Sequence, residues 1–381
     1  LGAAWWASVR HNDREGNSRS RRSLAAVAAR PSISAATGEF ADPPIYRDLT
    51  IMIVDFQHHF TPRELIKDDP GDRLIVHYDE SGAPSYTVHR LLYDLDEHIR
   101  MMDLAGIDAA LLTSAAGMCA DLERSRLCND TASRAERDYP GRFIGAAHAH
   151  PLGGPTAFRE LARCRDELGF AGVVITSEAE GLFLDAREFE AFWTEAARLG
   201  MFVFVHPALK LNHPQQFDGY DTARSVGREF SLIMATIRLI NSGVFDRHPQ
   251  LTVHMAHLGG GIASMLGRIR SYQDKEFWGT AGNPRHGMKP AKDFDHYFAH
   301  NLVFDTAGFC GAIGAVKAAL VEIPAARIVF ATDYPQEIRA REVVRDFVTD
   351  IRALGPGGEQ ILAGNVGLLL KERSAARRAS A

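Results

Sequence analysis

The chain has 381 residues, of which 46% are hydrophobic and 24% charged, and its formal net charge at pH 7 is −5. This supplies ample apolar material for a large core and gives no charge bias toward nucleic acid or an anionic membrane. No apolar run approaches the roughly 18 residues of a membrane span, so we expect a cytoplasmic protein. The 4 cysteines show no C-x-x-C spacing, which argues against a zinc knuckle or a disulfide framework.

Residues 1–51 are rich in Ala, Ser and Arg and show no hydrophobic periodicity. This segment has two possible interpretations. It is either a targeting leader, a class of segment that is poor in acidic residues, or translated sequence upstream of a start at Met52. Acidic residues such as Asp13 and Glu15 weaken the leader interpretation. We therefore expect a disordered extension over 1–51 and one folded domain over 52–381.

From residue 51 onward, short apolar runs alternate with longer amphipathic ones, as in repeated strand–helix units. Eight strands are predicted, over Ile51–Phe56, Ala109–Ser114, Phe143–Ala147, Ala171–Thr176, Met201–His206, Leu251–Ala256, Leu302–Asp305 and Ile328–Thr332. The helices predicted between them include Asp96–Leu104, Thr156–Leu168, Ala186–Leu199, Ser225–Ser242, Ile262–Tyr272, Gly311–Val321 and Ile338–Leu354. This order predicts an α/β protein, a (β/α)8 TIM barrel. An open doubly wound sheet is the alternative, but the first strand–helix junction lacks a G-x-G-x-x-G loop.

One insertion interrupts the pattern at about residues 61–92. Within it, Leu74–Tyr78 and Tyr86–His89 flank a turn signal at residues 80–84. This arrangement predicts a small hairpin after the first strand, leaning over the barrel mouth as a lid.

Three strand ends carry polar side chains suited to chemistry. They are Asp55-Phe56-Gln57-His58-His59, Val205-His206-Pro207 and Ala331-Thr332-Asp333-Tyr334-Pro335. Strand ends converge at one face of a barrel, so two imidazoles, a carboxylate and an amide would meet there. Nitrogen and oxygen ligands of this kind suit a divalent metal with one open position, zinc first and manganese second.

Strand alternation sorts the neighbouring residues. Asp55, Gln57 and His59 are expected to share one face, while His58 points the other way. Of His254 and His257, which lie three apart, only one can face the barrel interior, and we choose His257 because the glycine run after it marks the end of the strand, where catalytic groups sit. Each candidate ligand also has a purely structural explanation. A single histidine at a strand end is often only a hydrogen-bonded core residue, and Asp333 could cap the following helix. Asp305 and His148 are candidates to support the metal ligands. Gly259–Gly261 carries only a weak phosphate-loop signal.

At these residues the chain resembles the amidohydrolase-related family that includes aminocarboxymuconate semialdehyde decarboxylase and the hydroxybenzoate-type decarboxylases. The resemblance covers nearly all of residues 52–381. The motifs that carry it are Val54–Pro62, Met102–Asp108, Phe204–Pro207, Ser242–Pro249, Ala256–Gly261, Phe304–Gly308 and Ala331–Pro335. It implies metal ligands at His59, His206 and Asp333 and a catalytic histidine at His257. Gln57 stands where the family usually has His or Glu, and an amide oxygen is a weaker donor than a carboxylate.

The resemblance implies a metal-dependent non-oxidative decarboxylase of an aromatic or unsaturated carboxylic acid. Asp333 would protonate the ring carbon, and His257 would serve as general acid or base. The second hypothesis is a metal-dependent hydrolase or hydratase that uses the same site, and the third is a non-catalytic binding protein with a barrel fold.

The family binds its substrate with an arginine in the inserted segment, and the corresponding position here is near Tyr86, which is not an arginine. Arg90, a few residues later, is the candidate to take over that role. Five aromatic residues lie next to the site motifs, and they either form an apolar pocket for a substrate ring or, as is more common, only pack the barrel rim. They are Phe56, Phe60, Phe277, Trp278 and Phe309, of which Phe309, like Asp305 and Arg90, is a candidate to bind the substrate or support the site. The expected partner is a small carboxylate in a homodimeric enzyme, without nucleic acid or membrane.

Overall fold

The structure is a computed structural model that describes residues 52–67, 70–71, 73–78, 84–273 and 290–370. The predicted N-terminal extension lies outside the described residues, as do Phe277 and Trp278.

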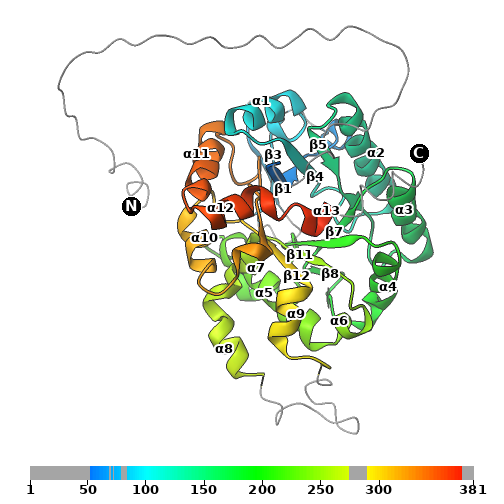
Figure 1. Ribbon diagram of the computed structural model, residues 1–381. Coiled ribbons are helices and arrows are strands. Elements are labelled where there is room, and N and C mark those ends of the chain that lie inside the picture. The colour runs from blue at the N-terminus through cyan, green and yellow to red at the C-terminus, as the bar shows by residue number, and fades with distance from the viewer. Residues whose placement is uncertain (1–51, 68–69, 72, 79–83, 274–289, 371–381) are drawn as a thin grey trace, which may run out of the picture. The chain divides into compact units, whose positions relative to one another are not determined.

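Parallel strands form the centre of the fold, with helices around them (Figure 1). One sheet has the order β1-β4-β5, and the other has the order β13-β12-β11-β10-β7-β6. Every pairing within these two sheets is parallel. The strands are β1 Val54–His59, β4 Ala109–Thr113, β5 Phe143–Gly145, β6 Ala147–His148, β7 Gly172–Thr176, β10 Phe202–His206, β11 Val253–Met255, β12 Leu302–Asp305 and β13 Ile328–Val329. The predicted α/β class with a parallel sheet is confirmed.

The two sheets are joined on both sides. β5 and β6 are separated only by Ala146, whose N–H donates to Leu112 O at 3.3 Å. On the other side, the Phe56 N–H donates to Phe330 O at 2.9 Å and the Asp333 N–H donates to Gln57 O at 3.0 Å. The first strand therefore lies directly beside the segment that follows the last one.

Amphipathic helices cover the strands, since each buries one apolar face. α11 shows the pattern, with Val344, Phe347, Val348 and Ile351 buried. The longer helices are α1 Leu95–Ala105, α2 Leu122–Asp138, α3 Gly154–Asp166, α4 Glu190–Arg198, α5 Arg228–Asn241 and α11 Arg341–Arg352. Shorter ones are α6 Val244–Arg247, α8 Leu266–Ser271, α9 Phe294–His300, α10 Ile313–Ala319, α12 Pro356–Glu359 and α13 Gly367–Leu370.

The first strand differs from its predicted bounds. It runs over Val54–His59 rather than Ile51–Phe56, because the polar residues Gln57, His58 and His59 are buried and continue the ladder. The last strand is shorter than predicted, since residues 330–334 pair with β1 by isolated backbone bonds.

The insertion contains two antiparallel strands, β2 Ile75–Tyr78 and β3 Pro84–Val88. The predicted turn between them lies outside the described residues. Thr87 Oγ1 donates to Gln336 Oε1 at 2.9 Å, and Gln336 Nε2 donates back to Thr87 O at 3.1 Å. β3 is thereby fixed to the loop that follows Asp333.

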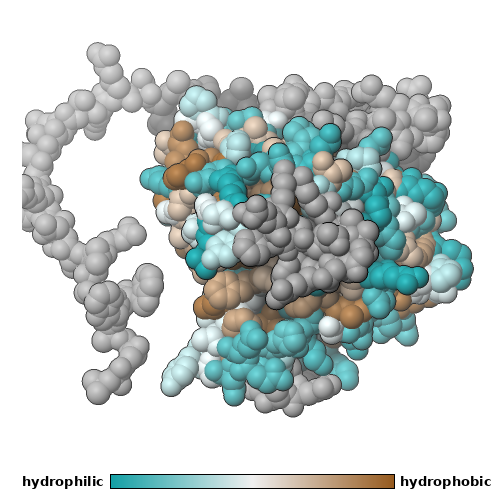
Figure 2. All heavy atoms as spheres, turned by 90° about the horizontal axis from the view of Figure 1, so that it is seen from below, coloured by the Kyte–Doolittle hydropathy of each residue, from teal (hydrophilic) through white to brown (hydrophobic). Residues whose placement is uncertain are grey.

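None of the helices in the described part of the chain is long and apolar enough to cross a membrane. On the face seen in Figure 2, hydrophilic residues alternate with smaller apolar groups.

The stability of the fold depends on pH through the buried side chain of His148. The Ser114 N–H donates to His148 Nε2 at 2.9 Å, so that nitrogen must stay unprotonated. Burial lowers the pKa of His148 from 6.5 to about 3. An unfolded chain takes up this proton below pH 6.5, whereas the folded chain resists it, so the stabilising effect of neutral His148 is full above pH 6.5.

We expect the free energy of unfolding to fall as the pH drops from 6.5 toward 3, with His148 contributing up to about 1.4 kcal/mol per pH unit. Urea unfolding at pH 7 and pH 5 measures this. The His148→Gln variant should show a weaker pH dependence, while the exposed control His77→Gln keeps that of the parent. Equal slopes in parent and His148→Gln would contradict the assignment.

Candidate metal and catalytic site

The buried carboxylate of Asp55 joins β1 to the segment after β13. Its Oδ1 accepts the N–H groups of Gln57 at 3.2 Å and Thr332 at 3.0 Å. Its Oδ2 accepts the Thr332 hydroxyl at 2.5 Å and pairs with His58 Nδ1 at 2.9 Å. Strict alternation predicted that Asp55 shares the site face with Gln57 and His59, and this prediction is wrong. The β1–β4 register shifts between Asp55 and His58, and the Asp55 carboxylate is turned to Thr332 and His58 instead.

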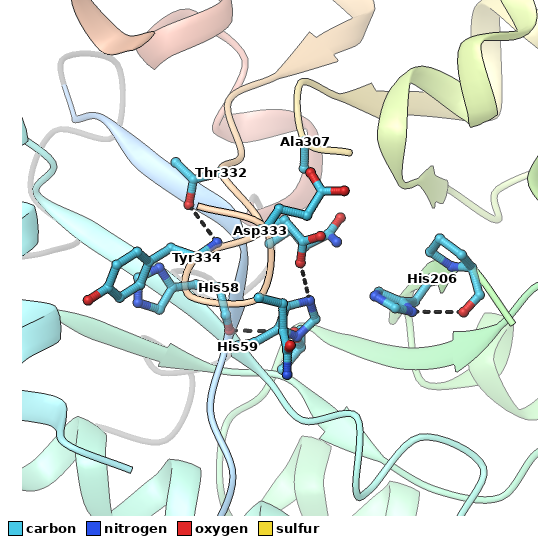
Figure 3. A network of polar contacts seen from close by, with 12 residues as sticks. His58, His59, His206, Ala307, Thr332, Asp333 and Tyr334 are labelled. Atoms are coloured by element: carbon cyan, nitrogen blue, oxygen red, sulfur yellow. Dashed lines mark hydrogen bonds and ion pairs between the residues drawn. The ribbon is translucent and has the colours of Figure 1, made fainter. Parts of the chain in front are cut away.

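Three buried side chains from distant strands converge at one point. One ligand atom each from His59, His206 and Asp333 lies within 4.8 Å of the others. His59 Nε2 is 2.5 Å from Asp333 Oδ1, and Figure 3 shows these two side chains pointing toward one another. His59 ends β1, His206 ends β10, and Asp333 follows β13. The structure thus brings together three of the four predicted ligands.

The other ring nitrogens of the two imidazoles are each held by a neighbouring oxygen. His206 Nδ1 donates to Pro207 O at 2.9 Å, because a carbonyl can only accept, so its Nε2 offers a lone pair. His59 Nδ1 lies 3.0 Å from Thr113 Oγ1, which holds the ring with Nε2 toward Asp333. Such outer contacts are the usual support for metal-binding histidines.

Two buried oxygens near His257 lack a hydrogen bond. Within the described residues Gln57 Oε1 has no partner, and Asp333 Oδ1 has only its ion pair with His59 Nε2 at 2.5 Å. A buried amide oxygen in this state is costly, and a bound cation would satisfy it. The two imidazole nitrogens and the carboxylate of Asp333 fit a divalent metal, and the Gln57 amide beside His257 offers a further oxygen.

The glycine run after β11 forms a left-handed turn. His257, Leu258, Gly259, Gly260 and Gly261 have φ angles of 55°, 52°, 65°, 73° and 75°. This turn, α7 (His257–Gly261), requires a conformation that glycine adopts without strain and that His257 and Leu258 adopt at a cost. The run is therefore explained by chain geometry, and its effect is to aim His257 into the site.

His257 contacts three polar side chains. Its Nδ1 lies 2.9 Å from Glu229 Oε1, and its Nε2 lies 3.0 Å from Gln57 Nε2 and 3.6 Å from Asp333 Oδ2. Gln57 and Asp333 thus both face the Nε2 side of the imidazole.

Asp305 supports His257 through the backbone. Its Oδ1 accepts the His257 N–H at 2.8 Å, and its Oδ2 lies 2.7 Å from His254 Nε2. Asp305 therefore fixes the start of the turn, while His254 stays in the core and stacks on Phe204.

The ionisable side chains of the site shift one another's pKa values. Burial would lower the pKa of His257, but the neighbouring Glu229 and Asp333 carboxylates outweigh it and raise this pKa well above its ordinary value. Burial would raise the pKa of Asp333, but His59 and His257 hold it well below its ordinary range. Burial, aided by His59, lowers the pKa of His206. Burial beside Asp333 raises the pKa of Glu337 to about 7.

The remaining predicted residues lie elsewhere or at the edge. Arg90 is 51% exposed and pairs with Asp94 at 2.6 Å. Phe309 is partly buried near Gly261 and follows Gly308, which packs against His257. Phe56 and Phe60 are core residues, 1% and 2% exposed.

One residue that contacts His257 was not predicted. Glu229 lies in the first turn of α5, where an acid is common for local reasons alone because it complements the helix dipole. No local sequence pattern predicts that α5 packs against the turn after β11. A signal was available only in the glycine run, which permits close approach of a neighbouring backbone.

The comparisons with known proteins agree with this geometry. The amidohydrolase family pattern matches residues 54–354. The chain belongs to the amidohydrolase family. It is 30% identical over 301 residues to a gamma-resorcylate decarboxylase of Rhizobium sp. (strain MTP-10005), covering 74% of this chain and 88% of that protein. It is 27% identical over 215 residues to the 2-amino-3-carboxymuconate-6-semialdehyde decarboxylase of Dictyostelium discoideum, covering 56% and 57% of the two chains.

Solved structures show the same fold. A 2,6-dihydroxybenzoate decarboxylase complexed with 2,6-dihydroxybenzoate superposes with a TM-score of 0.70 at 25% identity, covering 84% of this chain and 99% of that one. A dihydroxybenzoic acid decarboxylase from Polaromonas sp. JS666, with bound manganese and 2-nitroresorcinol, gives 0.69 at 24% identity, covering 84% and 97%. The expected family resemblance is confirmed.

Gly308 provides a test of how His257 is held. A Cβ at this position would lie 2.2 Å from His257 Cγ, and its φ of +87° disfavours any L side chain. We expect Gly308→Ala to displace the imidazole and lower stability by about 1–3 kcal/mol. Gly267→Ala in α8 meets nothing within 4 Å and should be neutral or stabilising. Thermal unfolding of both variants checks this, and equal melting temperatures would contradict it.

Proposed function

We propose that this amidohydrolase is a metal-dependent, non-oxidative decarboxylase of a hydroxyaromatic carboxylic acid. The observation that carries the proposal is the buried convergence of His59, His206 and Asp333, with His257 beside it. The similarity to several decarboxylases supports the reaction type, and the bound 2,6-dihydroxybenzoate of one solved relative suggests the substrate class.

We infer that Gln57, His59, His206 and Asp333 hold the ion. Zinc is the first choice from the nitrogen and oxygen donors, and manganese, present in the Polaromonas structure, is the second. Such an ion supplies positive charge that polarises a substrate oxygen and stabilises developing negative charge. Gln57 contributes an uncharged oxygen, so the protein ligands carry one negative charge in total, from Asp333.

The proton for the ring carbon comes from the pair His257 and Asp333. His257 Nε2 lies 3.6 Å from Asp333 Oδ2, so a proton can pass between them once substrate fills the site. Asp333 then protonates the carbon that bears the carboxylate. The carbon–carbon bond to the carboxylate breaks, carbon dioxide leaves, and the electron pair of that bond restores the aromatic ring.

We also infer that the strands close into a (β/α)8 barrel. The hydrogen bonds from Phe56 to Phe330 and from Asp333 to Gln57 connect β1 to the segment that directly follows β13, which supports closure. In a barrel the site would occupy the end where side chains of several strands meet.

Arg228 is the proposed partner of the substrate carboxylate. It precedes Glu229 at the start of α5, and the charge of Asp333 acts on its guanidinium. Burial lowers the pKa of Arg228 to about 10, so it stays cationic at neutral pH. A partly buried cation whose charge acts on Asp333 suits an anionic substrate.

We expect Arg228→Met to raise KM for a hydroxybenzoate by about tenfold or more, because a charge-assisted hydrogen bond is lost. Arg224→Met is the matched control, since Arg224 pairs with Asp221 at 2.5 Å one turn earlier. Steady-state kinetics of both variants decide this. An unchanged KM in Arg228→Met would remove Arg228 from the substrate site.

The function is tested by metal analysis together with carbon dioxide release. We expect about one zinc or manganese per chain, and release of carbon dioxide from 2,6-dihydroxybenzoate that stops after chelation. His206→Ala should lose at least about tenfold in metal affinity. Gln57→His should hold metal more firmly against a chelator, because imidazole is a stronger donor than an amide oxygen.

Two results would contradict the proposal. Metal-loaded protein that releases no carbon dioxide from a panel of hydroxybenzoates, but hydrolyses an ester or lactone, would show a hydrolase. Metal uptake by Gln57→His alone, with none in the parent, would show that Gln57 disables the site and would favour a non-catalytic protein.

A further inference from the structure

Glu229 makes a long-range contact that the reaction as described does not use. It lies in the first turn of α5, and its side chain is 17% exposed. Its Oε1 is 2.9 Å from His257 Nδ1, although 28 residues separate the two in the chain. Its other oxygen, Oε2, is buried and has no hydrogen-bond partner within the described residues. The carboxylate is therefore directed at His257.

The chain around His257 is shaped to allow this contact. A Cβ on Gly260 would lie 2.0 Å from the Glu229 carbonyl oxygen, so α5 packs directly on the left-handed turn. Any side chain at position 260 would push α5, and Glu229 with it, away from the imidazole. The close approach of helix and turn is thus what brings the carboxylate within hydrogen-bond distance.

The contact fixes which nitrogen of His257 faces the site. A carboxylate accepts hydrogen bonds, so it holds the proton on Nδ1. Nε2 is then the nitrogen that faces Gln57 at 3.0 Å and Asp333 at 3.6 Å. Without Glu229, nothing on the Nδ1 side would hold the ring, so a ring flip could turn Nε2 away from Asp333, and loss of the Nδ1 proton would change whether Nε2 donates or accepts.

We propose that Glu229 is the positioning residue of His257, acting from α5 to hold the Nδ1 proton and to direct Nε2 toward Asp333. This rests on the proposed role of His257 in decarboxylation and extends it by one residue. Glu229 itself touches neither the ligand cluster nor the path of the substrate proton.

The test compares Glu229→Ala and Glu229→Gln with the parent in the zinc-loaded full-length chain. Glu195→Gln is the matched control, because Glu195 is 18% exposed and pairs with Arg198 at 2.7 Å on α4. The readouts are kcat and KM, zinc per chain, and the ¹⁵N imidazole resonances of labelled histidine. His257→Asn identifies the resonances of His257 by their loss.

We expect Glu229→Ala to lower kcat about 10- to 100-fold, with zinc content unchanged and KM within about threefold. The Nδ1–H resonance of His257 should shift or disappear in this variant. Glu229→Gln should restore that resonance and part of kcat, because its amide oxygen can accept the same hydrogen bond. Glu195→Gln should match the parent in all readouts. If Glu229→Ala fails to fold, Glu229→Leu, whose side chain accepts no hydrogen bond, takes its place with the same expected results.

Parent kcat together with parent His257 resonances in Glu229→Ala would overturn the proposal. A fall in kcat that follows loss of zinc would overturn it too, because it would show a structural role. If the parent releases no carbon dioxide, the proposed function fails, but the resonances still decide whether Glu229 holds His257.

Discussion

The candidate site depends on one buried carboxylate. Asp55 accepts hydrogen bonds from Gln57 and from both the backbone and hydroxyl of Thr332, which lie 277 residues away from it. This contact fixes the end of the first strand against the segment after the last. Gln57 and His59 on one side, and Asp333 on the other, therefore occupy adjacent positions before any ion binds. The carboxylate performs this task without facing the ligand cluster.

His257 is held by a different means. β11 ends, and the chain then makes five successive left-handed residues, which place the imidazole against Gly308 and α5. Such a turn permits no Cβ at Gly260 and is costly at Leu258. The site thus combines two rigid parts, a ligand cluster fixed by strand pairing and an acid–base residue fixed by a turn. Gln57, in contact with His257, connects them.

The sequence predicted the strand–helix order and placed His59, His206 and Asp333 together, because each ends an apolar run and parallel strands end on the same side. It did not predict the direction of Asp55, since an irregular register in β1 breaks the strict alternation on which that prediction rested. Glu229 was missed for another reason. Its importance arises from helix packing on a glycine turn, and a contact between segments 28 residues apart leaves no local pattern.

The close packing of α5 on Gly260 also limits how this chain can evolve. A substitution at position 260 would displace the helix backbone and leave His257 Nδ1 without its carboxylate, so it would be tolerated only if another acid arose nearby. The converse does not hold, because the contact at Gly260 is made by the backbone carbonyl of residue 229 and the φ of Gly260 is +73°, so position 260 stays restricted whatever side chain residue 229 carries. The turn can therefore outlast the carboxylate, and related proteins that keep this glycine are free to hold their histidine by a different residue.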